Sequence, residues 1–158
     1  MINDMKYEDI VGEYKEVSLE LYNSGVRKIL YTEIESPYPD GKLIVSTTNP
    51  DGIITHVNQS FIEMSGYTEQ ELIGESHSIL RHPDMPSAAF QDLWDTVRKG
   101  DKWQGFVKNL RKDGGYYWVK AVVIPNFRNG QLVAYSSIRR KPSRTKVDES
   151  IRLHSTMF

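Results

Sequence analysis

The chain has 158 residues, with 20 basic and 21 acidic side chains, a net charge of −1 and no cysteine. This length suits one domain with a modest extension and a sizeable core. The balanced charge argues against a nucleic-acid partner, which requires a basic excess. Without cysteine there is no disulfide, thiolate metal ligand, thiol nucleophile or cysteinyl cofactor adduct. The absence of disulfides suits a cytoplasmic protein.

Neither a signal peptide nor a membrane-spanning segment is predicted. Residues 1–20 contain interspersed acidic side chains and no apolar block. No run approaches the ~18 apolar residues that a spanning helix needs. We therefore expect a cytoplasmic protein that reaches a membrane only through a partner.

An amphipathic helix is predicted over residues 5–30. Ile10, Tyr14, Val17 and Leu21 follow a 4-3-4 spacing, which places them on one face of a helix. Such a face can pack against the rest of the protein, form a homodimer with a second copy, or dock on a partner. The sequence leaves these uses open.

Five strands are predicted in the remainder of the chain. β-Branched residues bounded by turn signals indicate them, and Asp-Gly and Asn-Gly pairs mark turns because they tolerate positive φ. The expected strands are residues 43–48, 53–57, 103–111, 116–124 and 132–139. Two strands that open this region and three that close it can share one antiparallel sheet.

The segments between the second and third strands are predicted to be helical. Asn58 is expected to cap a first short helix, and Thr68 with Glu71 to form a capping box on the next. Pro86 is expected in the first turn of a longer helix that ends near Gly100. These helices must cover one face of the sheet, and the space between the two layers is a candidate ligand pocket.

These expectations divide the chain into three parts. Residues 1–41 form a helical extension and a linker, which is marked by two prolines and an Asp-Gly turn at residues 35–41. Residues 42–142 form an α+β domain. Residues 143–158 form a C-terminal helical tail.

A set of short motifs runs through residues 42–145. They are Asn58-Gln59-Ser60-Phe61, Ser65-Gly66-Tyr67-Thr68, Glu71-Leu72-Ile73-Gly74, Arg81-His82-Pro83-Asp84-Met85-Pro86, Phe90-Gln91-Asp92-Leu93-Trp94, Trp103-Gln104-Gly105, Val107-Lys108-Asn109, Arg111-Lys112-Asp113-Gly114, Tyr117-Trp118-Val119 and Ser137-Ile138-Arg139. Together they resemble the PAS sensor family, most closely the flavin-binding PAS domains of bacterial aerotaxis and energy-taxis receptors. The resemblance implies the PAS fold, a five-stranded antiparallel sheet with short helices on one face.

The same resemblance implies an FAD-binding redox or oxygen sensor for energy taxis or aerotaxis, acting without enzymatic activity. It also implies a membrane-bound, methyl-accepting type of chemoreceptor as the partner. Receptors of this kind continue into membrane and coiled-coil segments, whereas this chain stops at Phe158. We therefore expect a stand-alone PAS protein that signals through a separate chain.

Arg81, His82 and Asp84 are the sharpest candidates for cofactor contacts. The guanidinium of Arg81 can bind a phosphate or a flavin carbonyl, and the imidazole of His82 can donate or accept near neutral pH. Residue types alone favour another interpretation, in which an Arg–Asp pair pins the loop and Asp84 caps the following helix. The resemblance favours cofactor binding.

The other candidate cofactor contacts are two tryptophans, an asparagine and a histidine. Trp94 and Trp103 offer flat surfaces for stacking on a flavin or for packing in the core. The amide of Asn109 can both donate to and accept from a ring, unless it is simply an exposed strand residue. His77 can contact a cofactor or, like His56, ligate a haem.

No GxSxG, Walker or GxGxxG motif is present, so the residues predict no catalytic function. Four histidines with no cysteine make no recognisable metal site. A cofactor-free interaction domain and a haem gas sensor remain open alternatives to the flavin sensor.

Overall fold

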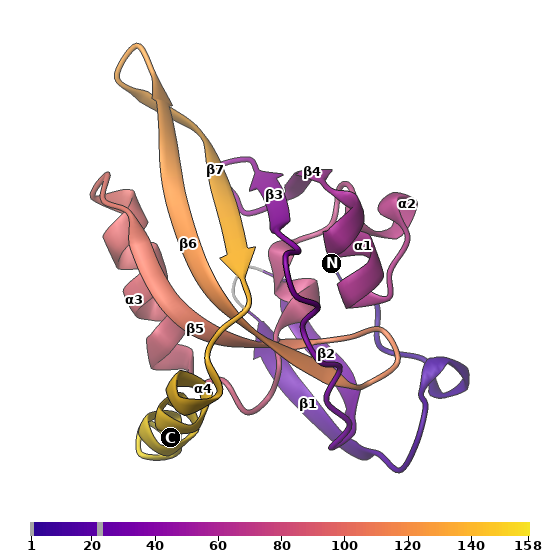
Figure 1. Cartoon of the computed structure of the whole chain (residues 1–158). Helices are drawn as coiled ribbons and strands as arrows, with labels where there is room; N and C mark the ends of the chain where they lie inside the picture. The colour runs from indigo at the N-terminus through magenta and orange to yellow at the C-terminus, as the bar shows by residue number, and fades with distance from the viewer. Residues whose placement is uncertain (1, 22–23) are drawn as a thin grey trace.

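The computed structural model describes residues 2–21 and 24–158. Its helices and strands (Figure 1) are, in chain order, the 3-10 helix η1 (Tyr7–Asp9), β1 (Lys15–Leu21), β2 (Gly25–Tyr31), β3 (Ile44–Thr48), β4 (Ile54–Val57), α1 (Gln59–Ser65), α2 (Glu69–Leu72), the 3-10 helix η2 (His77–Leu80), α3 (Ser87–Arg98), β5 (Trp103–Leu110), β6 (Tyr116–Arg128), β7 (Gln131–Arg140) and α4 (Arg144–Ser155).

A five-stranded antiparallel sheet forms the centre of the fold, in the order β4-β3-β7-β6-β5. Two opening and three closing strands share it, as predicted. The β6–β7 hairpin is longer than predicted and projects beyond the other elements (Figure 1). Asn129 and Gly130 both have positive φ, 52° and 78°, which suits a tight hairpin turn.

Local capping signals account for the short helices between β4 and β5. Asn58 accepts a bond from the backbone of Phe61, and Thr68 and Glu71 form the predicted capping box. Pro86 lies at the N-cap of α3, one residue before the first turn in which it was expected. The main hydrophobic core fills the space between these helices and the inner face of the sheet.

The C-terminal helix α4 packs on the opposite, outer face of the sheet. A C-terminal helix was predicted for residues 143–158, and Ser143 caps it by accepting a hydrogen bond from the backbone N–H of Lys146. The ring of His154 on α4 stacks on Trp118 of β6, with centroids 6.1 Å apart. The cavity side of the sheet is therefore separate from the face that α4 covers.

The predicted N-terminal helix over residues 5–30 is wrong. After η1, β1 and β2 form an antiparallel two-stranded sheet, from Lys15 opposite Tyr31 to Leu21 opposite Gly25. Along β1 the less exposed residues alternate with exposed ones, which is the period of a strand. Val17 and Leu21, four residues apart, fit both a strand and a helix, so the spacing misled. The helix through which a homodimer was expected to form is therefore not present in this segment.

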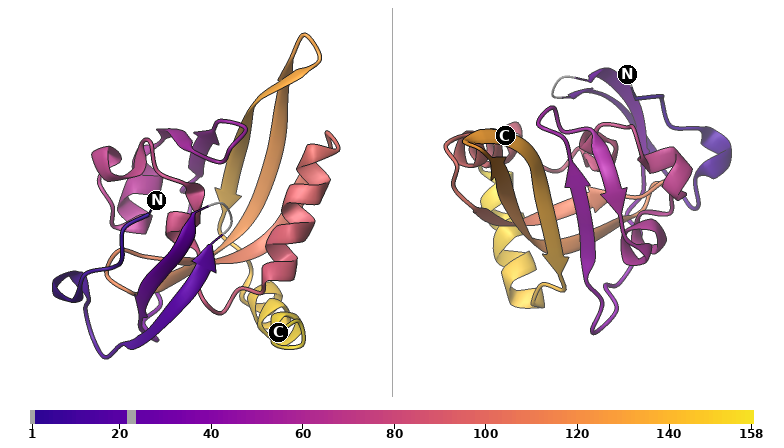
Figure 2. Two further views of the ribbon diagram at one scale, coloured as in Figure 1. Left: turned by 180° about the vertical axis from the view of Figure 1, so that it is seen from behind. Right: turned by 90° about the horizontal axis from the view of Figure 1, so that it is seen from above.

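The β1–β2 hairpin packs against the domain as part of one structure (Figure 2). A second buried cluster, Met5, Ile29, Leu30 and Leu110, joins it to β5. Gly114, in the β5–β6 turn, has a φ of 88°, and a Cβ there would lie 3.1 Å from the carbonyl oxygen of Leu30. Glycine thus allows both the turn and the close approach of β2.

The segment between β2 and β3 has no regular helix or strand, as expected for residues 35–41, yet it is anchored. The ring of Tyr38 is buried, and its hydroxyl donates to the carbonyl oxygens of Lys42 and Arg139, at 3.0 and 2.9 Å. No helix in the described part of the chain is long and apolar enough to cross a membrane.

Candidate functional site

A cavity of about 470 Å³ lies between the inner face of the sheet and the helices η2 and α3. The end of β1 closes a further side of it. Its lining combines aromatic rings, aliphatic side chains and a few polar groups. Among the lining residues are His77, Arg81, Phe90, Trp94, Trp103, Val107, Asn109, Tyr135, Ser137 and Arg139.

Two tryptophans provide much of the aromatic wall. Trp94 on α3 meets Tyr135 of β7 edge to face, with centroids 5.7 Å apart. Trp103 begins β5, and its indole Nε1 donates to Asp92 at 2.9 Å. A Cβ at position 105 would collide with the indole of Trp103, so Gly105 leaves room for this ring. Both tryptophans therefore line the cavity and also pack with the hydrophobic core.

Arg139 supplies a buried positive charge at the polar end of the cavity. This residue of β7 is 3% exposed, and one guanidinium nitrogen, Nη2, lies 3.2 Å from Ser46 Oγ and 2.6 Å from His77 Nε2. The other, Nη1, has no hydrogen-bond partner among the described residues. Burial lowers the pKa of Arg139 to about 10, so it stays charged at neutral pH.

The contact with Arg139 fixes the state of His77. Burial, with the charge of Arg139 as a second cause, lowers the pKa of His77 to about 3. The imidazole is therefore neutral at pH 7. Because a guanidinium can only donate, His77 Nε2 accepts and the proton lies on Nδ1.

Two further buried polar atoms on the cavity walls form no well-aligned hydrogen bond in the described structure. They are the hydroxyl of Thr48 on β3 and the amide nitrogen of Asn109, which is 4% exposed on β5 and whose side chain interacts with the hydroxyl of Tyr117 opposite it on β6. Buried polar atoms are nearly always hydrogen-bonded in folded proteins. Together with Arg139 Nη1, these atoms are suited to a polar ligand.

Arg81 lines the cavity beside Asn109, to which it is joined by an isolated antiparallel backbone bridge. Its guanidinium lies over the ring of Phe90, 4.5 Å from the centroid, and donates to the carbonyl oxygens of His82 and Met85. Burial lowers the pKa of Arg81 to about 10. The described residues supply no carboxylate that pairs with it.

His82 and Asp84 lie behind this wall and do not line the cavity. His82 is 1% exposed, lies edge-on to the rings of Tyr31 and Tyr116, and accepts a bond from the backbone of Asp84. Asp84 pairs with Lys108 at 2.7 Å. The Arg81–Asp84 pair and the Asp84 cap considered from the sequence are both wrong, because Lys108 takes the carboxylate and no side chain caps α3.

The fold thus brings five of the seven predicted site residues to one cavity, namely His77, Arg81, Trp94, Trp103 and Asn109. Sequence reasoning missed Arg139, Thr48, Tyr135 and Phe90. A signal for Arg139 was present, because Tyr135, Ser137 and Arg139 alternate along β7 and so point to one face. No group of three or more potential metal ligands occurs among the described residues.

A five-stranded antiparallel sheet with a cavity beneath short helices is the arrangement of a PAS sensor domain. Residues 54–139 match the PAS fold family, which is more than half of the chain. The chain belongs to that family.

Two relatives are similar in sequence. The chain is 48% identical over 110 residues to the aerotaxis receptor of Escherichia coli (strain K12), covering 70% of this chain and 22% of the receptor. It is 25% identical over 132 residues to the nitrogen fixation regulatory protein of Klebsiella pneumoniae, covering 82% of this chain and 26% of that protein. The chain therefore spans about a quarter or less of these relatives.

Solved structures agree on the fold. A light-oxygen-voltage domain studied with a flavin analogue superposes with a TM-score of 0.61 at 22% identity. The superposition covers 72% of this chain and 86% of that domain. At this identity the likeness shows a shared fold.

Proposed function

We propose that this chain is a flavin-binding redox or oxygen sensor module of energy taxis or aerotaxis, with FAD as its cofactor. The observation that carries the proposal is the cavity itself. It holds a buried arginine, Arg139, and a half-buried one, Arg81, neither with a carboxylate partner, and a buried amide without a well-aligned hydrogen bond, between aromatic walls. The 48% identity to an aerotaxis receptor supports the same assignment.

The residues present fit such a cofactor in size and chemistry. A cavity of about 470 Å³ lies within the usual range for small-molecule sites. Trp94, Trp103 and Tyr135 offer flat surfaces to a planar ring. Leaving a buried donor unpaired costs ~1–3 kcal/mol, so a ligand that accepts from Asn109 and Arg139 removes a penalty that the empty domain carries.

Each polar residue has a distinct task in this proposal. Asn109 would hold the polar edge of the ring, since its amide donates and accepts. Arg139 Nη1 would donate to a ring carbonyl or to negative charge on the ring. Arg81, nearer the start of α3, would hold a phosphate, for which a guanidinium is well suited. A bound flavin supplies reversible electron uptake, with a change of charge or protonation at its ring.

Two contacts would transmit the structural effect of a change in ring charge to residues outside the sheet. Arg139 bonds His77 of η2, and Asn109 is bridged to the backbone of Arg81. A shift in the bonds of Arg139 or Asn109 would therefore bias the position of η2 and the loop that follows it. The expected output is altered docking on a partner, by a shift between two conformations.

For the partner we propose a membrane-bound, methyl-accepting type of chemoreceptor on a separate chain. The similarity to an aerotaxis receptor supports the class. Co-purification from the native cell membrane would test it, because a receptor of that class should be retained by the tagged protein. Normal movement of cells lacking the protein in oxygen and energy gradients would contradict the taxis role.

The site disfavours the two alternatives. A haem sensor needs a free imidazole nitrogen, but Nε2 of the cavity histidine, His77, already contacts Arg139. A cofactor-free domain would leave Arg139 Nη1 without a partner and the amide of Asn109 without a well-aligned one. The absorption spectrum of the purified protein separates these cases. We expect flavin bands that survive in the supernatant after heat release, whereas a colourless protein or a Soret band would contradict the proposal.

A further inference from the structure

The N-terminal hairpin contributes one wall of the ligand cavity. The last two residues of β1, Glu20 and Leu21, line it. Leu21 is 4% exposed and belongs to the main hydrophobic core, as does Ile2. A ligand that fills the cavity therefore contacts the hairpin as well as the sheet and η2.

Arg27 on β2 connects this hairpin to η2, which lines the cavity. The side chain is 3% exposed. Its guanidinium donates to three neutral oxygens, the carbonyls of Asn3 and Ile79 at 2.9 and 3.0 Å and the hydroxyl of Tyr67 at 3.2 Å. The described residues give it no ion pair. Because burying a cation is costly without good hydrogen bonds, the docked hairpin depends on these three contacts forming together.

The bond to Ile79 connects Arg27 to the segment that carries the candidate cofactor contacts. Ile79 lies in η2, whose other residues His77, Ser78 and Leu80 line the cavity. Arg81 follows directly as the C-cap of this helix. Holding the carbonyl of Ile79 therefore constrains the backbone that positions both His77 and Arg81.

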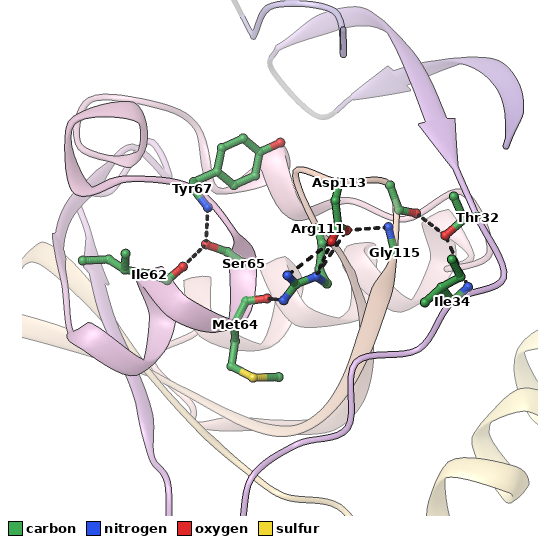
Figure 3. A network of polar contacts seen from close by, with 10 residues as sticks. Thr32, Ile34, Ile62, Met64, Ser65, Tyr67, Arg111, Asp113 and Gly115 are labelled. Atoms are coloured by element: carbon green, nitrogen blue, oxygen red, sulfur yellow. Dashed lines mark hydrogen bonds and ion pairs between the residues drawn. The ribbon is translucent and has the colours of Figure 1, made fainter. Parts of the chain in front are cut away.

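The base of the hairpin is anchored elsewhere. Thr32, directly after β2, donates its backbone N–H to the carbonyl oxygen of Gly114 at 2.8 Å. Figure 3 shows Thr32 in a polar network with Arg111 and Asp113 of the β5–β6 connection, and none of these residues lines the cavity. The hairpin thus has one attachment away from the ligand site and a second, at Arg27, beside it.

We propose that Arg27 is a positioning residue that couples docking of the β1–β2 hairpin to occupancy of the cavity. A ligand stabilises the docked hairpin through Leu21 and η2, and the docked hairpin in turn retains the ligand, because such coupling is reciprocal. The identity of the ligand, a flavin, rests on the proposed function; the coupling of the hairpin to η2 does not.

The test uses the full chain and two matched substitutions. Arg27→Met keeps a long, flexible aliphatic chain but removes all three hydrogen-bond donors. The control, Arg128→Met, changes an exposed arginine at the end of β6. FAD should dissociate about 10- to 100-fold faster from the Arg27 variant, as expected for lost charge-assisted bonds. The control should match the wild type.

Amide hydrogen exchange distinguishes a coupling role of Arg27 from a merely structural one, because only coupling makes protection of the hairpin depend on FAD in a way that Arg27 controls. In the wild type FAD should slow exchange in β1 and β2, whereas in Arg27→Met this dependence on FAD should vanish while β5, β6 and β7 stay protected. Hairpin protection that still responds to FAD in Arg27→Met, or an unchanged rate of FAD dissociation, would overturn the inference.

Exchange without ligand separates this inference from the proposed function. The amides of Ile79 and Arg81, which bond the carbonyls of Ser76 and Ser78 at 3.0 Å, report on η2. Both should exchange faster in ligand-free Arg27→Met, together with the hairpin. If the wild type binds no flavin, the proposed function fails, and this comparison still decides the coupling. Faster exchange in the hairpin with no change at Ile79 and Arg81 would refute it.

Discussion

At the scale of single residues, the site is distinguished by positive charges that are withdrawn from solvent and have no counter-charge. Half-buried Arg81 and buried Arg139 both have a pKa lowered to about 10 by desolvation, and Arg27 is buried among neutral acceptors. A buried cation in this state destabilises the free protein unless a partner compensates it. Arg27 has three such acceptors within the fold, whereas one nitrogen of Arg139, a residue that lines the cavity, has no hydrogen-bond partner among the described residues.

Replacing Arg139 should separate ligand affinity from stability. Arg139→Met removes an incompletely paired buried charge, so the ligand-free protein should unfold at an equal or higher denaturant concentration, while FAD affinity falls about 10- to 100-fold. The adjacent Arg140, which is exposed on the same strand, is the control as Arg140→Met. If both stability and affinity dropped in proportion, Arg139 would be a structural residue only.

Arg81 and Asp84 should behave differently although they lie in one motif. Arg81→Ala should weaken flavin binding by about 10- to 100-fold, corresponding to ~1.5–3 kcal/mol, with the fold retained. Asp84→Asn breaks the ion pair with Lys108, in which Asp84 is 51% exposed, and should change the free energy of unfolding by ~1 kcal/mol or less. Flavin titration and circular dichroism of the two variants decide this. Loss of flavin in Asp84→Asn at full stability would place Asp84 in the site after all.

The buried histidines predict the pH dependence of stability. The pKa of His77 and that of His82 are each lowered to about 3, chiefly by burial, so below pH 6.5 the unfolded chain binds more protons than the folded one. Stability should therefore be full above about pH 6.5 and fall toward pH 3, with each histidine adding ~1.4 kcal/mol per pH unit to the slope.

Chemical denaturation of ligand-free protein between pH 7 and 4 measures that slope. His82→Gln should reduce that slope by the equivalent of about one bound proton. A slope that His82→Gln does not alter would mean that His82 titrates normally in the folded protein.

At the scale of elements, the N-terminal hairpin behaves as part of the domain. Ile29 is fully buried in the cluster that joins β2 to β5, whereas Val26 on the same strand is 59% exposed. Ile29→Ala should lower the free energy of unfolding by ~2–4 kcal/mol, and Val26→Ala by ~0.5 kcal/mol or less. If Ile29→Ala left the free energy of global unfolding unchanged, the hairpin would be a loosely attached extension.

The elements also show what sequence patterns can predict. The caps at Asn58 and Thr68 are local, so their side chains and spacing were enough to place α1 and α2. The hairpin was missed because Val17 and Leu21 satisfy both a helical and a strand period. Arg139 was missed for another reason. Its partners Ser46 and His77 lie 93 and 62 residues away, and only the sheet topology brings them together.

At the scale of the whole molecule, one cavity joins the sheet, η2, α3 and the hairpin. Its polar groups come from separate strands and from η2, so a ligand bound there would contact parts of the chain that are distant in sequence. The outer face of the sheet carries α4 instead. The cavity and α4 therefore lie on opposite faces of the sheet.

Direct titration of ligand-free protein with FAD, FMN and riboflavin is the most direct test of a flavin site in this cavity. The account predicts one FAD bound per chain, and riboflavin bound at least about tenfold more weakly because it lacks the phosphates for Arg81. Arg81→Ala should abolish that difference. No saturable binding of any of the three flavins, or binding that Asn109→Ala and Arg139→Met leave unchanged, would contradict the account.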